Sequence, residues 1–199
     1  MRLNLLKFYL GDLRYLRNPK FARASFLLGI FYLFCNPYRY CRKFLEKRGA
    51  EEVHAYGETP LTTLEKIACK AKIGKDDLFL ELGSGRGKNA LWMGAHVGCQ
   101  VIGIEWIERF AKRASWAAIG MKNVSFIHAD VLDVSFEGAT VIYLYGSSWN
   151  EELICRLAKK IPVGAKIISI SFPLSGFTLL EEFPVAFPWG NTSAYLLAR

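Results

Sequence analysis

The sequence of 199 residues predicts an α/β fold, with seven strands in one sheet and an N-terminal helical arm. Three observations predict it. Short apolar runs of strand length alternate with helix-compatible segments beyond residue 51. A glycine-rich turn, Gly83–Gly87, joins the first of these runs to a helix. The composition is 52% hydrophobic and 14% aromatic, which supports a packed core and argues against a disordered chain.

Residues 1–50 are expected to form a basic, apolar helical arm, and residues 51–199 the main domain. Residues 1–48 hold 11 Lys and Arg against two acids, a net charge of +9, whereas the remainder is nearly neutral. Residues 24–38 are uncharged, but a membrane-spanning helix needs about 20 such residues. Three alternatives stay open: a helical cap on the domain, a helix in an anionic membrane interface, or a nucleic-acid-binding arm. The contiguous apolar residues favour the first two.

The strongest functional pattern begins with Leu78–Leu82, an apolar run that predicts a buried strand. Glu81 precedes Gly83 by two residues, and glycines follow at alternate positions. A dinucleotide fingerprint would place its third glycine one residue later, and a phosphate loop would need Ser or Thr where Asn89 stands. The pattern acid-x-G-x-G-x-G resembles motif I of class I S-adenosylmethionine (SAM)-dependent methyltransferases. This resemblance implies a Rossmann-like methyltransferase sheet, and a carboxylate suits SAM because SAM carries an ammonium and a sulfonium but no phosphate.

Two further acids follow predicted strands in the order that this cofactor requires. Glu105 ends the apolar run Val101–Ile104 and lies 18 residues after Gly87, near the roughly 20 expected for a ribose-binding acid. Asp130 ends the next run and resembles the acid that meets the adenine amino group. Trp106 could stack near the adenine or serve as a core residue. The alternative is a non-binding α/β domain whose strands simply end in turn residues.

A second resemblance starts from Tyr56-Gly-Glu-Thr59, which precedes a helix of about a dozen residues and then Lys75–Gly87. It resembles the non-SET, "disruptor of telomeric silencing"-type histone lysine methyltransferases, and implies that this loop folds over SAM and helps form a lysine channel. Thr59 could alternatively N-cap the helix, with Pro60 at its first position. Motif and resemblance together assign cofactor binding to Tyr56, Glu58, Thr59, Glu81, Gly83, Ser84, Gly85, Gly87, Asn89, Glu105, Trp106, Asp130 and Val131.

The acceptor side of the site follows the predicted strand Val141–Tyr145. It continues into Gly146-Ser-Ser-Trp149. The histone enzymes carry an Asn-rich turn at this place, and this sequence does not. It also lacks the Asn/Asp-Pro-Pro-aromatic turn that would indicate a DNA-adenine enzyme. Ala165–Leu174 resembles the small organellar-type lysine methyltransferases that modify membrane proteins, which also carry an apolar N-terminal segment. The resemblance implies protein lysine N-methylation of a basic or membrane-associated protein. Tyr56, Tyr145 and Trp149 are expected to line a dry channel, in which desolvation lowers the pKa of the lysine ammonium.

The rest of the chain completes the predicted fold and leaves other functions open. A helix over Glu151–Lys160 and strands over Lys166–Phe172, Leu180–Phe187 and Ser193–Leu197 end the sheet with an antiparallel hairpin. One alternative is a methyltransferase for RNA or a small molecule, and the nearly neutral charge of the domain argues against RNA. The other is a non-catalytic SAM-binding module tethered by its arm.

Cysteine and histidine usage bounds the chemistry and the compartment. The five cysteines form no C-x-x-C pair, and the three histidines show no metal-ligand spacing. We therefore expect a reducing compartment, no metal site, and a cytoplasmic protein that the arm could bring to an anionic membrane surface.

Overall fold

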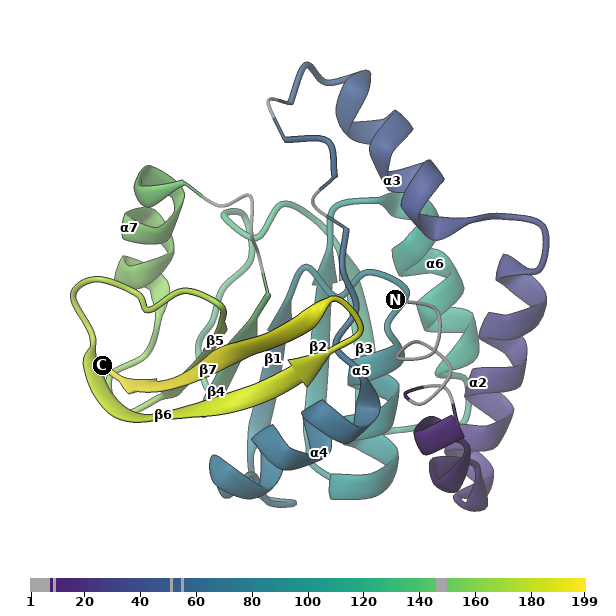
Figure 1. Ribbon diagram of the computed structural model, residues 1–199, viewed down its shortest axis with the longest axis horizontal. Helices are drawn as coiled ribbons and strands as arrows, with labels where there is room; N and C mark the ends of the chain where they lie inside the picture. Colours follow the sequence, from purple (N-terminus) through teal and green to yellow (C-terminus); the bar gives the residue numbers. More distant parts are fainter. Residues whose placement is uncertain (1–7, 9, 51, 55, 146–149) are drawn as a thin grey trace.

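The computed structural model describes residues 8, 10–50, 52–54, 56–145 and 150–199. Its centre is a seven-stranded sheet of order β3-β2-β1-β4-β5-β7-β6 (Figure 1). The first five strands are parallel and the last two are antiparallel, as the sequence predicts. The strands are β1 (Leu78–Leu82), β2 (Gln100–Glu105), β3 (Val124–His128), β4 (Val141–Leu144), β5 (Lys166–Ile170), β6 (Thr178–Phe187) and β7 (Gly190–Ala198).

The direction of the strand order reverses between β1 and β4, and this point positions the site. β1 pairs with β2 on one side and with β4 on the other, so that Leu82 lies beside both Ile104 and Leu144. The carboxyl ends of these three strands therefore meet at one edge of the sheet. Open α/β sheets bind ligands in the crevice at such a switch point.

Helices cover both faces of the sheet, so the central strands are buried and read as apolar runs. One core contains Phe79, Phe110 and Tyr143, and the other contains Leu80, Ile142 and Leu157. Behind the predicted glycine turn, α5 continues into a π-helical turn, η2, so this helix is not regular throughout. The helices of the domain are α4 (Leu61–Lys70), α5 (Lys88–Trp92), η2 (Met93–Val97), α6 (Glu108–Ala117) and α7 (Glu151–Lys160).

The arm consists of η1 (Leu13–Arg17), α2 (Pro19–Tyr32) and α3 (Pro37–Glu46). Asn18 and Asn36 each precede a proline and cap the helix that follows, because each side chain accepts hydrogen bonds from two backbone amides. α2 runs alongside α6 (Figure 1). None of the helices in the described ranges is long and apolar enough to cross a membrane.

The arm and the domain share one hydrophobic core. Phe21, Ala24, Leu28 and Tyr32 recur at helical spacing on α2 and are all buried within the same cluster as Phe110. The contacts expected of a helical cap are thus present in the structure.

Candidate active site

A cavity of about 610 Å³ opens at the carboxyl ends of β1, β2 and β4. Trp149 was predicted to line the acceptor channel but lies outside the described residues. Gly87 does not line the cavity. All other residues predicted for the site do so, namely Tyr56, Glu58, Thr59, Glu81, Gly83, Ser84, Gly85, Asn89, Glu105, Trp106, Asp130, Val131 and Tyr145.

Gly87 serves packing rather than the cavity. It adopts a left-handed φ of 78° and caps α5, and a Cβ added there would lie 2.7 Å from Ala114 and 2.6 Å from Phe126. The glycine therefore lets the start of α5 approach α6 and β3. Gly85 differs, because a Cβ added there would lie 3.2 Å from the ring of Tyr56, so the glycine leaves room for that ring.

Glu105 holds the glycine loop in place from the end of β2. Its carboxylate accepts hydrogen bonds from the backbone N–H groups of Gly85 and Ile107, each at 2.7 Å. Burial raises the pKa of Glu105 to about 7, and these amide donors oppose the rise. Each carboxylate oxygen has two lone pairs, so acceptor capacity remains for a ligand hydroxyl.

Glu81 is a buried acid with an unused oxygen. Its Oε1 accepts a hydrogen bond from the Asn89 side chain at 3.1 Å, while its Oε2 is buried without a partner among the described residues. Burial raises the pKa of Glu81 to about 8. An unpaired buried acceptor that borders a cavity is costly unless a ligand donor satisfies it. A cationic group of the cofactor could do so here.

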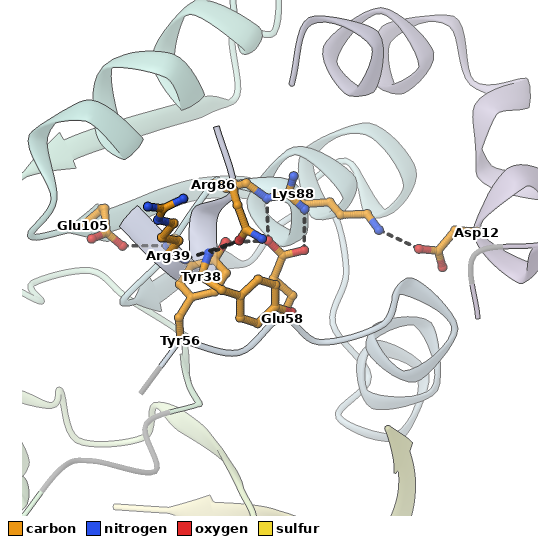
Figure 2. Close-up of polar contacts among 10 residues, drawn as sticks. Asp12, Tyr38, Arg39, Tyr56, Glu58, Arg86, Lys88 and Glu105 are labelled. Carbon is orange, nitrogen blue, oxygen red and sulfur yellow. Dashed lines mark hydrogen bonds and ion pairs between the residues drawn. The ribbon is translucent and has the colours of Figure 1, made fainter. Parts of the chain in front are cut away.

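Glu58 lies at the centre of a polar cluster that joins the predicted loop to the glycine turn (Figure 2). Arg86 donates to both of its oxygens, at 2.5 and 2.6 Å, and the Tyr56 hydroxyl donates to it at 2.5 Å. Burial alone would raise the pKa of Glu58, but the hydrogen bonds and charge of Arg86 outweigh burial and lower it.

Arg86, which lies inside the glycine turn, has a distant acid as its partner. The guanidinium forms a bidentate pair with Glu58, which is 28 residues earlier in the chain. In the sequence, this pair is visible only as an acid in the Tyr56–Thr59 loop and an arginine in the glycine turn, and nothing local links the two.

Thr59 does not cap α4, contrary to the capping prediction. Pro60 takes the N-cap position without a side-chain hydrogen bond, and the Thr59 hydroxyl instead meets the Tyr143 hydroxyl at 2.5 Å. Both residues are buried, so this pair fixes the loop to β4. Tyr143 also lines the cavity, and sequence reasoning missed it because it read as an ordinary strand residue.

Tyr145 brings an aromatic group to the other side of the loop. Its ring would lie 2.9 Å from a Cβ at Gly57, so the glycine allows a close approach of loop and ring. The ring also packs on Phe187, at 5.2 Å between centroids, and Phe187 stacks on Trp189 at 5.3 Å. The cavity is therefore bordered by an aromatic cluster at the end of β4.

Asp130 and Val131 lie on the loop after β3 and border the same cavity. The Asp130 carboxylate accepts a hydrogen bond from the backbone N–H of Leu132 at 2.9 Å. This bond fixes the loop and leaves the second carboxylate oxygen for other partners.

The arm contributes a wall of the cavity that sequence reasoning did not predict. Cys41, Phe44 and Leu45 of α3 line it. The Phe44 ring packs edge-on against Trp106 at 5.4 Å, and the Arg48 guanidinium lies 4.4 Å over the Trp106 ring.

Two further arm contacts reach the turn between β1 and α5. The Tyr32 ring lies 5.1 Å from the Arg86 guanidinium, and Asp12 forms an ion pair with Lys88 at 2.6 Å (Figure 2). The arm thus contacts the polar cluster through Tyr32 and the adjacent start of α5 through Asp12.

Comparisons with known proteins agree with this geometry. The family model described as "Histone methylation protein DOT1" matches residues 44–124, which include α4, the glycine turn and β2. No match to a curated protein is found.

Solved structures show the fold. An RNA methyltransferase from Salinibacter ruber in complex with S-adenosyl-L-homocysteine (SAH) has a TM-score of 0.61 at 21% identity, over 71% of this chain and 93% of that chain. The chain has the class I methyltransferase fold. A mutant of MtNAS in complex with S-adenosylmethionine gives 0.63 at 13% identity, over 96% and 77% of the two chains. TrmN from Thermus thermophilus gives 0.58 at 18% identity, over 68% and 48%.

The fold, the family match and the cavity together support a SAM-dependent methyltransferase with SAM as its cofactor. The predicted seven-stranded methyltransferase sheet is confirmed. The class of methyl acceptor is a separate question.

Proposed function

We propose that this protein transfers the methyl group of SAM to a lysine side chain of a protein. The observation that carries the proposal is the placement of the Tyr56–Thr59 loop between the glycine turn and Tyr145. Tyr56 reaches back over Gly85, while Gly57 lies against the Tyr145 ring. The loop therefore joins the cofactor side of the cavity to its aromatic side.

The carboxylates divide the cofactor between them. Glu81 would meet the SAM ammonium, because its Oε2 is buried without a partner in the described structure. Glu105 would accept hydrogen bonds from the ribose hydroxyls while it holds the glycine loop. Asp130 would meet the adenine amino group, with Trp106 beside the ring. The Glu58–Arg86 pair would hold the loop closed over these groups.

The chemistry needs position and a dry path more than acid catalysis. When bound, SAM would supply its methyl carbon to a lysine Nζ lone pair placed in line with the carbon–sulfur bond, and the electron pair of that bond would pass to sulfur. The lysine must first release a proton to solvent, and an aromatic, poorly hydrated channel lowers the pKa of its ammonium. Tyr56 and Tyr145 would form that channel, and their hydroxyl oxygens would accept hydrogen bonds from the amine.

Two facts favour a protein acceptor over RNA. The DOT1 family match spans residues 44–124 and so includes the Tyr56–Thr59 loop as well as the cofactor turn. Residues 49–199 are nearly neutral, whereas an RNA enzyme usually presents a basic surface beside its site. The likeness to an RNA methyltransferase at 21% identity concerns the fold.

The test is a radiolabelled-SAM assay of the full chain on a lysate of the source cell, with protein and RNA separated before counting. Tyr145→Phe removes one channel hydroxyl, and Tyr195→Phe makes the same change on β7, away from the residues that line the cavity. We expect label in protein, recovered as methyl-lysine and reduced by Tyr145→Phe alone.

Calorimetric SAM binding accompanies each assay and separates the possible failures. Label in RNA would overturn the lysine acceptor while leaving the methyltransferase intact. Intact SAM binding with no label in protein, RNA or small molecules would point to a non-catalytic module.

A further inference from the structure

Helix α2 has two apolar faces, of which only one is covered. The inner face packs on the domain through Phe21, Ala24, Leu28 and Tyr32. On the opposite side, Phe26 and Ile30 of α2 and Leu33 and Phe34 of the turn that follows it are large apolar side chains in solvent. Their exposed fractions are 68% for Phe26, 52% for Ile30, 70% for Leu33 and 96% for Phe34.

Two more exposed apolar side chains lie on α6 and just after its end. Trp116 and Ile119 are 61% and 63% exposed, and the Trp116 ring lies 5.9 Å from the ring of Phe31 on α2. We call these six exposed residues the outer apolar face: Phe26, Ile30, Leu33, Phe34, Trp116 and Ile119. Contiguous apolar surface of this kind marks an interaction site on a soluble protein.

Exposed lysines flank the apolar residues of the arm in the sequence. Lys20 precedes them at the start of α2, and Lys43 and Lys47 follow them on and after α3. The two acids of the arm do not offset these cations, because Asp12 pairs with Lys88 and Glu46 pairs with Arg42. The arm therefore combines bare hydrocarbon with a net positive charge.

We propose that the outer apolar face docks on an anionic lipid membrane. The 14 residues of α2 are too few to span a bilayer, which takes about 20, so the helix would lie in the interface. Its phenylalanines would enter the acyl boundary, and the lysines would meet the lipid headgroups. Nucleic acid would bind the lysines through charge but would leave the four bare apolar side chains of α2 and its following turn exposed to water.

Two competing protein partners are less consistent with these residues. A second copy of the chain would place the same lysines against each other across a two-fold axis. A protein interface of ordinary composition is depleted of lysine.

The test is flotation of the full chain with phosphatidylcholine vesicles, prepared with and without phosphatidylglycerol. The double variant Phe26→Ser/Phe34→Ser removes hydrocarbon from the outer apolar face. Val163→Ser makes the same kind of change at a residue that is 85% exposed in the turn after α7, and serves as the matched control. Circular dichroism and SAM binding show that each variant is folded.

We expect wild type and the control to float with anionic vesicles and to detach as salt rises. The double variant should bind at least about a hundredfold more weakly, because burial of each phenylalanine contributes roughly a factor of ten or more. SAM affinity should be the same in all three proteins.

Several results would overturn the proposal. These are no flotation of wild type, equal binding to neutral vesicles, or equal loss in the control and the double variant. A wild-type dimer that the double variant converts to monomer would assign the face to a second copy. RNA binding that the two phenylalanines support would assign it to nucleic acid. The methyl-transfer assay on lysate does not depend on any of these results.

Discussion

Replacing Arg86 by methionine tests whether the polar cluster holds the site together. The Arg86 and Glu58 side chains are only 22% and 23% exposed, so their bidentate pair is largely withdrawn from water. Methionine keeps most of the volume but removes the charge and both hydrogen bonds. Within the described residues, the Tyr56 hydroxyl is then the donor that Glu58 keeps.

The cost follows from the charge that is left unpaired. Removing one partner of a buried pair costs about 3–5 kcal/mol, and partial exposure places this pair at about 3 kcal/mol of unfolding free energy. The loop that carries Tyr56 also loses its tie to the glycine turn. If SAM binding must order that loop again at a free-energy cost of about 1–2 kcal/mol, the affinity of the variant for SAM falls roughly tenfold.

The pH dependence gives the sign of the effect. In wild type the lowered pKa of Glu58 means that its contribution is present above the usual glutamate range and is lost as pH falls through the lowered value. In Arg86→Met, burial without its partner should raise this pKa instead. The deficit of the variant should then be full near neutral pH and should shrink in mild acid.

Urea denaturation and calorimetric SAM binding measure these quantities. Lys112→Met removes a lysine from an exposed pair with Glu108, and serves as the control that should change neither quantity measurably. The double variant Arg86→Met/Glu58→Met should recover most of the lost stability, because no charge is left unpaired. Equal effects of Arg86→Met and Lys112→Met, or a double variant less stable than Arg86→Met, would refute the reasoning.

Three more predictions follow from the same contacts. Glu105→Ala deprives two backbone amides of their acceptor and should weaken SAM binding about a hundredfold by calorimetry, and an unchanged affinity would remove the ribose assignment. Affinity for SAH should rise between about pH 6 and pH 8, because Glu81, with a pKa of about 8, must ionise to meet the ligand ammonium. Glu81→Gln should flatten this pH profile, and a steep profile in that variant would contradict the assignment. Phe21→Ala should lower the unfolding free energy by about 3–5 kcal/mol in urea, whereas Phe26→Ala on the exposed face should change it little, and equal losses would contradict the packing of α2.

Much of the fold and the cofactor side of the site could be predicted because their signals are local. Buried parallel strands read as apolar runs, and their carboxyl ends must meet at one edge of the sheet. This rule was enough to bring Glu81 and Glu105, at the ends of two strands, and Asp130, on the loop after a third, to one cavity. The glycine spacing likewise distinguished the ligand class without any knowledge of distant contacts.

The remaining parts depend on pairing between segments, which no local pattern encodes. Arg86 and Glu58 are 28 residues apart, and Thr59 and Tyr143 are 84 apart. A threonine before a proline predicts a helix cap, but the buried Tyr143 hydroxyl needed a partner and Thr59 supplies it. Gly87 was predicted for the cofactor because motif glycines are read together, although its neighbours make it a packing residue.

The arm shows why sequence position alone is a poor guide to what belongs to a site. Its charge and hydropathy set it apart from residues 49–199, yet α2 buries its inner face in the core and α3 forms a wall of the cavity. The Tyr32 ring packs on the guanidinium that binds Glu58, so a chain of contacts runs from α2 to the Tyr56–Thr59 loop. A single helix thereby presents one face to the polar cluster and the opposite face to solvent. Any partner that binds the outer apolar face would therefore contact the same helix whose Tyr32 packs on Arg86. Helix α2 is thus common to the lipid-docking and the cofactor-binding measurements.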